Sequence, residues 1–460
     1  MFQTTLKKIS SIVSGRLYKI SDSHANTLMI QKVSTDSRDN KRDSIFIAIK
    51  GKIFDGHCFA EEAVKKGSLA ILSESLLPIN KPQIIVKSTI HAIERIAHWI
   101  RKKSRAKFIA ITGSSGKTSV KEMTTCILAK LGLTISTKEN YNNNLGVLLT
   151  LLRVSELHRY VVIEIGASKF KEIQYSSSIS NPDVALINNL FAAHLEGFES
   201  FSKLSKEKSE ILHGLSKFGT AIINLDNNDI KNWKNILKDL YRIRFFSLKK
   251  KGYSHFYATD IYHRKFFTQF NIHTPFGTAK ISNFLMGLHS VSNALASAAI
   301  SISVGASVKQ VEQGLNNFKP IHGRIYPLHI SPNKIILDDT YNSNFGSMIA
   351  AIDVLSEMTG YRVLVVGDML ELGGYSSFYH KKISRIVQHK KINRVISFGI
   401  ESVFISRSHP NGTHFFSQEE LMKELVSLIV THDEISMLIK GSRRARMENI
   451  INDICRRESL

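Results

Sequence analysis

FIAITGSSGKTSVKEMTTCILAKL, residues 108–131, joins a short apolar run, a glycine-rich turn and an amphipathic helical pattern. The run Phe108–Ile111 is typical of a buried strand, and apolar residues recur at helical spacing behind the turn. Glycines let backbone N–H groups close around a phosphate, and the dipole of the following helix favours its charge. The stretch therefore predicts a nucleotide-binding strand–turn–helix unit.

The turn supplies the candidate phosphate ligands, which are Gly113, Ser114, Ser115, Gly116, Lys117, Thr118 and Ser119. Lys117 can reach the terminal phosphates, and the Thr118 hydroxyl can hold Mg²⁺. The full Walker pattern has glycine five positions before Gly116, where this chain has Ile111. The match is therefore to the looser GxxGK[ST] form, and an ordinary strand–turn–helix corner is the alternative.

The length, net charge and cysteine content of the chain limit the classes of protein to which it can belong. A length of 460 residues suggests about three domains. The net charge is +23, but the basic residues are scattered, so we expect acidic, phosphorylated small substrates and no nucleic-acid partner. Cys58, Cys126 and Cys455 are far apart, which favours neither a disulfide framework nor a zinc site and suits the cytoplasm. No run approaches the ~18 apolar residues of a membrane span.

Apolar strand-type runs alternate with helical patterns along most of the chain, which predicts an α/β protein of three domains. Residues 1–100 are expected to form a small N-terminal α/β domain. Residues 101–315 are expected to form a central P-loop-type ATPase domain around a parallel sheet. Residues 316–460 are expected to form a C-terminal Rossmann-like α/β domain.

Two polar residues follow apolar runs in the central part. Glu164 lies near the end of the run 160–166, and His194 comes shortly after the run 183–188. Open α/β sheets bind ligands at the carboxyl ends of their strands, so both side chains are expected beside the phosphate turn. A carboxylate there suits Mg²⁺, with His194 as a second candidate ligand. An edge-exposed glutamate and a structural histidine are the alternatives.

Several polar loops are further candidates. Ser37 and Arg38 offer a hydroxyl and a guanidinium fork to a diphosphate, and the run 140–144 presents several asparagine amides. Three loops follow strand-type runs in the C-terminal part, at 338–342, 367–373 and 440–443. Each of these loops, taken alone, also fits ordinary surface or turn chemistry.

Taken together, these segments resemble one family along nearly the whole chain, the Mur ligases, which are ATP-dependent amide-forming enzymes of cell-wall synthesis. The segments are TDSR (35–38), GKIFDGH (51–57), TGSSGKT (112–118), NYNNNLG (140–146), EIGA (164–167), HLEGF (194–198), GR (323–324), DDTYNSN (338–344), GDMLELG (367–373) and KGSR (440–443). DDTYN and GDMLELG favour the member that joins D-alanyl-D-alanine to UDP-N-acetylmuramoyl-tripeptide. The resemblance implies a cytoplasmic ligase using ATP and Mg²⁺, and we expect a monomer.

The resemblance also implies roles for particular residues. The UDP end would contact Ser37 and Arg38 and the loop carrying Asp55, Gly56 and His57. Asn293 and Arg324 would contact the nucleotide. Either Asp338 or Asp339 would contact the ribose of the nucleotide, and Asp339 is favoured. The catalytic set would be Lys117, Glu164, His194 and Lys208, and Mg²⁺ would bind Thr118, Glu164, His194 and Lys208. Lys208 aligns with the family lysine that is carbamylated. Asn140, Asn142 and Asn143 would face the tripeptide, and Asp338, Asn342 and Lys440 are expected substrate contacts.

A carboxylate does not react with an amine unaided because oxide is a very poor leaving group, so phosphorylation by ATP to an acyl phosphate is the expected solution. A sibling ligase adding diaminopimelate or lysine, a folylpolyglutamate-synthase-like ligase, a basic nucleotide-dependent nucleic-acid-binding protein and an inactive homologue are the alternatives. The last is motivated by departures from the family pattern at Leu148, Lys171, Ser290 and Phe345.

Overall fold

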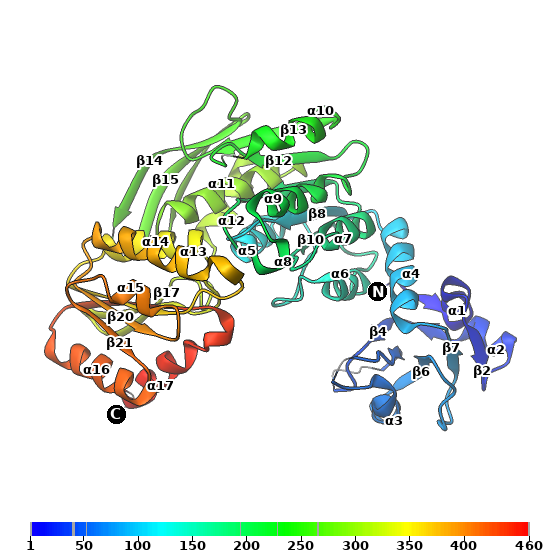
Figure 1. Ribbon diagram of the computed structural model, residues 1–460. Coiled ribbons are helices and arrows are strands. Elements are labelled where there is room, and N and C mark those ends of the chain that lie inside the picture. Colours follow the sequence, from blue (N-terminus) through cyan, green and yellow to red (C-terminus); the bar gives the residue numbers. More distant parts are fainter. Residues whose placement is uncertain are drawn as a thin grey trace.

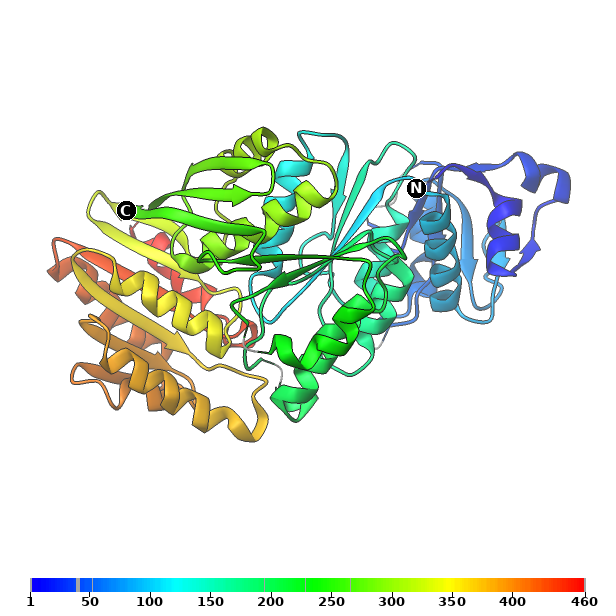
Figure 2. The same ribbon diagram turned by 90° about the horizontal axis from the view of Figure 1, so that it is seen from above.

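The computed structural model describes residues 2–38, 42–51, 53–193, 195–227, 229–264 and 266–458, without the side chains of residues 457 and 458. Within these residues, three larger sheets divide the chain into an N-terminal, a central and a C-terminal part (Figure 1). The N-terminal and C-terminal parts lie on either side of the central part in both views (Figures 1 and 2).

The N-terminal part is built on a sheet of strand order β2-β7-β6-β5-β4, parallel except for the pair β2–β7. Its strands are β2 (Arg16–Tyr18), β4 (Lys32–Ser34), β5 (Ser44–Ile47), β6 (Ser68–Ser73) and β7 (Gln83–Ile85), and β1 (Thr4–Thr5) pairs separately with β3 (Met29–Ile30). The helices are α1 (Leu6–Val13), α2 (Asp22–Thr27), η1 (Gly56–Phe59), α3 (Ala60–Lys65) and α4 (Thr89–Lys103). Helix α4 leads into the central part, where Arg101 donates to the carbonyl oxygens of Ser180 and Asn181.

The central sheet has the strand order β16-β15-β14-β13-β12-β11-β8-β10-β9. Its strands are β8 (Lys107–Thr112), β9 (Thr134–Ser136), β10 (Tyr160–Glu164), β11 (Val184–Ile187), β12 (Thr220–Asn224), β13 (Arg242–Ser247), β14 (Phe256–Arg264), β15 (Phe267–Thr274) and β16 (Gly277–Asn283). The strands from β9 to β14 are parallel, whereas β14, β15 and β16 run antiparallel to one another. Because β8 lies between β11 and β10, the loops that follow these three strands meet at one edge.

Helices cover both faces of this sheet. They are α5 (Lys117–Leu128), α6 (Asn144–Leu152), α7 (Glu172–Ser180), α8 (Leu195–Phe198), α9 (Phe201–Ser209), η2 (Glu210–Leu212), η3 (Ile230–Trp233), α10 (Lys234–Lys238), α11 (Leu288–Ser303) and α12 (Val308–Asn316). In β8, Phe108 and Ala110 join the core that contains α4, α6 and α7, while Ile109 and Ile111 join the core of α5, α11 and α12. The strand is thus buried on both faces, as the continuous apolar run predicts.

The C-terminal sheet has the strand order β17-β18-β22-β19-β20-β21, parallel except for β17. Its strands are β17 (Tyr326–Ser331), β18 (Lys334–Asp339), β19 (Tyr361–Gly367), β20 (Arg394–Phe398), β21 (Gly412–Phe415) and β22 (Ile435–Lys440). The helices are α13 (Phe345–Ser356), η4 (Gly373–Tyr375), α14 (Ser376–Gln388), α15 (Val403–Ser406), α16 (Gln418–Thr431), η5 (Arg443–Ala445) and α17 (Glu448–Glu458).

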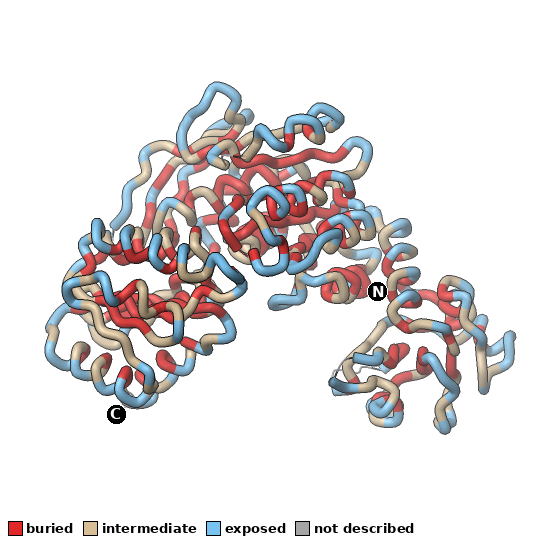
Figure 3. Tube along the Cα trace, viewed as in Figure 1, coloured by how far each residue is buried: buried red, intermediate tan, exposed pale blue. Residues whose placement is uncertain are grey.

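The architecture confirms the predicted α/β fold class. Buried residues concentrate in the strands and in the inner faces of the helices in each part (Figure 3). The antiparallel extension β14–β16 was not predicted, because its residues alternate between buried and exposed and carry no Gly-rich turn like that after β8.

Candidate active site

The phosphate turn is held rigidly by the loop that follows β11. Ser114 N donates to Asn189 O at 3.0 Å, and Ser115 N donates to Asn189 Oδ1 at 2.8 Å. Gly116 has φ 75°, and a Cβ there would lie 2.5 Å from Asn293 Oδ1, so glycine is required. Within the described residues, no side chain caps the first turn of α5, whose N–H groups are open to an anion.

Lys117 lies inside this turn, where its Nζ donates to Gly113 O at 2.8 Å. Burial lowers the pKa of Lys117, the Glu164 carboxylate opposes that shift, and Arg324 adds to it. The Lys117 Nζ therefore lies against the turn, and the Glu164 carboxylate favours the charged form of this group. This is the place predicted for a group that contacts transferring phosphate.

Glu164 and Thr118 form a pair of oxygen donors beside the turn. Thr118 Oγ1 donates to Glu164 Oε2 at 3.0 Å, and Asn142 Nδ2 donates to Glu164 Oε1 at 2.8 Å. The Glu164 side chain is buried at the carboxyl end of β10, with 2% exposed. Hydroxyl and carboxylate oxygens suit Mg²⁺. The predicted histidine ligand, His194, lies outside the described residues.

Lys208 comes from a different element, helix α9, and is 1% exposed. Burial and the neighbouring Lys117 lower the pKa of Lys208 to about 7, against the opposing influence of Glu207 and Glu172. The fold therefore brings together two lysines that are far apart in sequence. A pKa near neutrality leaves much of the Lys208 amine unprotonated, which is the form that reacts with carbon dioxide.

A cavity of about 40 Å³ opens beside the first turn of α5. Ser119, Ser290 and Arg324 supply polar lining, and Met123 and Phe318 supply apolar lining. Arg324 Nη2 also donates to Thr118 Oγ1 at 3.2 Å. Asn293 lies beneath the turn instead, where its Oδ1 accepts from Asn188 Nδ2 at 2.9 Å.

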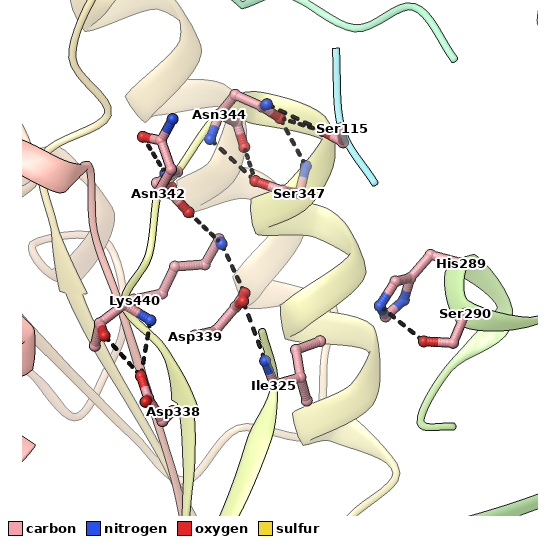
Figure 4. A network of polar contacts seen from close by, with 12 residues as sticks. Ser115, His289, Ser290, Ile325, Asp338, Asp339, Asn342, Asn344, Ser347 and Lys440 are labelled. Atoms are coloured by element: carbon pink, nitrogen blue, oxygen red, sulfur yellow. Dashed lines mark hydrogen bonds and ion pairs between the residues drawn. The ribbon is translucent and has the colours of Figure 1, made fainter. Parts of the chain in front are cut away.

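The polar residues at the end of β18 form a buried network (Figure 4). Lys440 Nζ lies 2.6 Å from Asp339 Oδ2 and donates to Asn342 O at 2.8 Å. Asp339 Oδ1 accepts from Ile325 N, while Asp338 accepts from Gly323 N and Thr340 N. Burial raises the pKa of Asp339 and lowers that of Lys440, and each charge opposes the shift of the other. In this conformation the Asp339 carboxylate is thus engaged by Lys440 rather than open to a ribose.

The three predicted asparagines have different surroundings. Asn142 contacts Glu164, as described above. Asn143 caps α6, with its Oδ1 accepting from Gly146 N at 2.9 Å. Asn140 is exposed, and its hydrogen bond to Tyr341 partly offsets the rise that burial causes in the pKa of the Tyr341 phenol.

The N-terminal candidates lie in the loops that follow parallel strands β4 and β5. Ser37 Oγ donates to Glu62 Oε2 at 2.7 Å, and Arg38 forms an exposed pair with Asp36. His57 Nε2 accepts from a backbone N–H, so its Nδ1 carries the proton donated to Asp55 Oδ1 at 2.6 Å. A Cβ at Gly56 would lie 2.6 Å from Ile49 N, which explains the glycine.

Two family models match the chain: the Mur ligase middle domain over residues 111–301, and the Mur ligase, glutamate ligase domain, over residues 323–443. A UDP-N-acetylmuramoyl-tripeptide–D-alanyl-D-alanine ligase from Buchnera aphidicola subsp. Acyrthosiphon pisum is 44% identical over 454 residues, which cover 99% of this chain and 98% of that protein. The chain belongs to the Mur ligase family. The ligase of the same name from Escherichia coli is 42% identical, over 98% of each chain. A crystal structure of MurF from Acinetobacter baumannii has a TM-score of 0.90 at 32% identity and 98% coverage of each chain.

The predicted family and enzyme class are confirmed, and the chain is a Mur ligase, an ATP-dependent amide-forming enzyme. Among the described residues, no helix has both the length and the apolar character needed to cross a bilayer.

The sequence interpretation missed residues that hold this Mur ligase site together. Asn188 and Asn189 fasten the phosphate turn through Ser115, and Asn344 reaches it from the C-terminal part. Asn344 is part of the motif DDTYNSN, but the motif alone does not predict which loop the Asn344 side chain contacts.

The four family departures have different surroundings, and two of them, Phe345 and Ser290, make specific side-chain contacts. Lys171, where glycine is usual, adopts φ 68° directly before α7. Phe345, where proline is usual, is the first residue of α13, and its ring centroid lies 5.1 Å from that of Tyr379. Ser290 lies in the first turn of α11 with its Oγ 3.3 Å from His289 Nε2 (Figure 4). Leu148 is buried in α6, and nothing further in the structure explains it.

Proposed function

We propose that this Mur ligase joins D-alanyl-D-alanine to the C-terminal carboxylate of UDP-N-acetylmuramoyl-tripeptide, with ATP and Mg²⁺, to give the pentapeptide precursor of peptidoglycan. The relatives that carry this activity in their names match the chain over almost its whole length. The observation that carries the proposal is the contact of Thr118 with both Glu164 and Arg324, because it joins a metal-type carboxylate to a phosphate turn.

The residues at the turn fit a triphosphate with its metal. Bound ATP would supply the phosphoryl group that converts the tripeptide carboxylate into an acyl phosphate, which an amine can attack. Residues 113–119 would wrap the phosphates, and the Lys117 ammonium would offset the charge of the transferring group. The Thr118 hydroxyl, Glu164 and His194 would hold Mg²⁺.

Lys208 would contribute as a carbamate. A protonated lysine repels a metal ion, whereas a carbamate presents two anionic oxygens. The lowered pKa of Lys208 supports this role, because the neutral amine is the nucleophile toward carbon dioxide. Its proximity to Lys117 supports this role, because the resulting anion would lie near the phosphate turn.

The substrates would bind at the loops of the three parts. Ser37, Arg38 and the loop with Asp55, Gly56 and His57 would hold the UDP group. Asn140, Asn142 and Asn143 would line the tripeptide end. Asn293, Arg324 and Asp339 would contact the nucleotide, and Asp338, Asn342 and Lys440, with the loops 367–373 and 440–443, would seat D-alanyl-D-alanine. Asp339 and Lys440 already bind each other, so their ligand contacts require rearrangement or bridging of that pair.

We assign these roles to domains at residues 1–100, 101–315 and 316–460, which agrees with the division of the three sheets. We further propose a monomer that works in the cytoplasm, where ATP and nucleotide-linked precursors are available. Because each substrate lies on a different domain, closure of the domains would assemble the reaction and exclude water.

The test measures phosphate release from ATP with purified protein and UDP-N-acetylmuramoyl-tripeptide. We expect release that depends on D-alanyl-D-alanine and not on diaminopimelate or lysine. Lys117→Ala should lower turnover by about 10²–10³-fold, since it removes a charge that stabilises the transition state. Lys130→Ala is the matched control, because Lys130 is exposed just beyond the other end of α5.

Release that requires diaminopimelate or lysine would identify a sibling ligase. Full turnover in Lys117→Ala would refute the role given to the phosphate turn.

A further inference from the structure

The side chain of Asn344 joins helix α13 of the C-terminal part to the phosphate turn of the central part (Figure 4). Its Oδ1 accepts from Ser347 N at 2.9 Å and so caps α13. Its Nδ2 donates to Ser114 O at 3.2 Å and to Ser115 Oγ at 3.0 Å. The amide oxygen therefore caps the helix, and both the oxygen and the nitrogen of the amide lie within hydrogen-bond distance of Ser115 Oγ in the turn.

A second contact leads back from the same turn to the C-terminal part. Arg324 Nη2 donates to Thr118 Oγ1, and the next residue, Ile325, donates its N–H to Asp339 Oδ1. Asp339 is paired with Lys440, whose Nζ also donates to Asn342 O, two residues before Asn344.

The contacts thus close a ring. It runs from Ser115 through Asn344 and Asn342 to Lys440, and then through Asp339, Ile325 and Arg324 back to Thr118. The buried ion pair holds the two arms, Asn344 and Arg324, at a fixed separation, and both arms end on the phosphate turn. The ring also includes Lys440, the first residue of the loop 440–443.

The backbone of α13 approaches the central part closely at the same point. A Cβ on Gly346 would lie 2.2 Å from Cγ of Phe191, so the Phe191 ring packs directly on the first turn of the helix. Phe191 is tied to the phosphate turn as well, because its N–H donates to Ser114 Oγ at 3.0 Å. The Asn344 amide therefore sits in an interface that leaves little room for the helix to shift.

We propose that Asn344 is a positioning residue, which fixes the loops of the C-terminal part at a set distance from the phosphate turn. It contacts Ser114 O and Ser115 Oγ of the turn, so it acts through the turn. This inference rests on the proposed function, because it assumes that the acceptor amine is seated by C-terminal loops and the phosphate by the turn. Nothing in the family resemblance assigned a role to this residue.

The test compares Asn344→Ser with Ser347→Ala. Serine keeps an N-cap for α13 but is too short to reach the turn. Ser347→Ala removes the hydroxyl that accepts from Asn344 N, on the same helix, without touching the turn. The first readout is hydrogen exchange of the full chain without any substrate. In Asn344→Ser we expect at least fivefold faster exchange in the segments 111–119 and 187–193, and no change there in Ser347→Ala.

The second readout is steady-state ligation. We expect Asn344→Ser to lower kcat at least tenfold, with KM for the UDP-linked substrate within twofold and an unchanged melting temperature. The double variant with Asn344→Ser and Ser115→Ala should have a kcat no lower than that of the more impaired single variant. The reason is that both substitutions remove the same contact. A purely structural role would lower the melting temperature, leave kcat unchanged and give additive effects.

Unchanged exchange in the segment 111–119 of Asn344→Ser, or an unchanged kcat, would overturn the inference. Wild-type protein that does not use D-alanyl-D-alanine would instead refute the proposed function, and the exchange comparison would still decide whether Asn344 holds the turn.

Discussion

Loss of the Lys440 charge should strongly destabilise the C-terminal part. Lys440→Met keeps a long apolar side chain but leaves Asp339 buried, with the Ile325 N–H as its remaining hydrogen-bond donor among the described residues. The two side chains are only 1% and 9% exposed, so water cannot easily replace the lost partner. Removal of one member of a buried pair typically costs about 3–5 kcal/mol.

The expected change in melting temperature follows from that free energy. For a unit of about this size, each kcal/mol shifts the midpoint by roughly 2–4 °C, so we expect a fall of about 10 °C in the C-terminal transition. Differential scanning calorimetry of the full chain measures it. Burial raises the pKa of Asp339, and without Lys440 nothing of comparable strength opposes that rise. A raised folded pKa means that the folded state takes up a proton as the pH falls, so the deficit should be smaller at pH 5 than at pH 8.

Two further variants test whether the loss of stability comes from the buried pair of Lys440 and Asp339. Lys391→Met changes an exposed lysine of the same part and should shift the midpoint very little. Lys440→Met combined with Asp339→Leu removes both charges and should recover most of the loss, since two apolar groups of similar size can replace a buried pair. A shift in Lys440→Met no larger than in Lys391→Met, or a double variant no more stable than the single one, would refute the reasoning.

Three other predictions follow from single features of the site. With the pKa of Lys208 lowered to about 7, its neutral fraction rises from about one-tenth at pH 6 to about nine-tenths at pH 8. Carbamate formed from ¹³C-bicarbonate and followed by NMR should rise over that range, and a flat or absent signal would contradict the assignment. Lys171→Gly should stabilise the protein by about 0.5–1 kcal/mol, because relief of the left-handed conformation, about 1–2 kcal/mol, exceeds the entropic cost of glycine; a lower melting temperature would show that Lys171 is not strained. Gly346→Ala should lower kcat despite the better helix propensity of alanine, and Phe191→Ala in the same chain should restore it if the clash with that ring is the cause.

The sequence predicted the strands that are continuous apolar runs, because their pattern is local. The runs 108–111, 160–166 and 183–188 fall on β8, β10 and β11, and the phosphate turn lies between β8 and α5 as expected. The antiparallel strands β14–β16 alternate between buried and exposed residues, contain no continuous apolar run of this kind, and were missed.

Contacts between distant residues could not be read from the sequence in the same way. Lys208 reaches Lys117 only because α9 packs onto the sheet, and Lys440 reaches Asp339 only because β22 lies beside β18. Asn143 looked like its neighbours Asn140 and Asn142, yet it is the N-cap residue of α6. The tertiary structure thus gives different contacts to neighbouring asparagines of the same polar loop.

One departure from the family pattern, Lys171, falls where backbone N–H groups make the supporting contacts. Lys171 N and Ile173 N both donate to the Glu207 carboxylate, which secures the start of α7 whatever side chain occupies position 171. Glu207 directly precedes Lys208 and also resists the fall in its pKa. The same carboxylate therefore anchors α7 and opposes the fall in the pKa of the lysine proposed to carry the carbamate. A lysine at position 171 leaves both of these contacts in place, which argues for an active ligase rather than an inactive homologue.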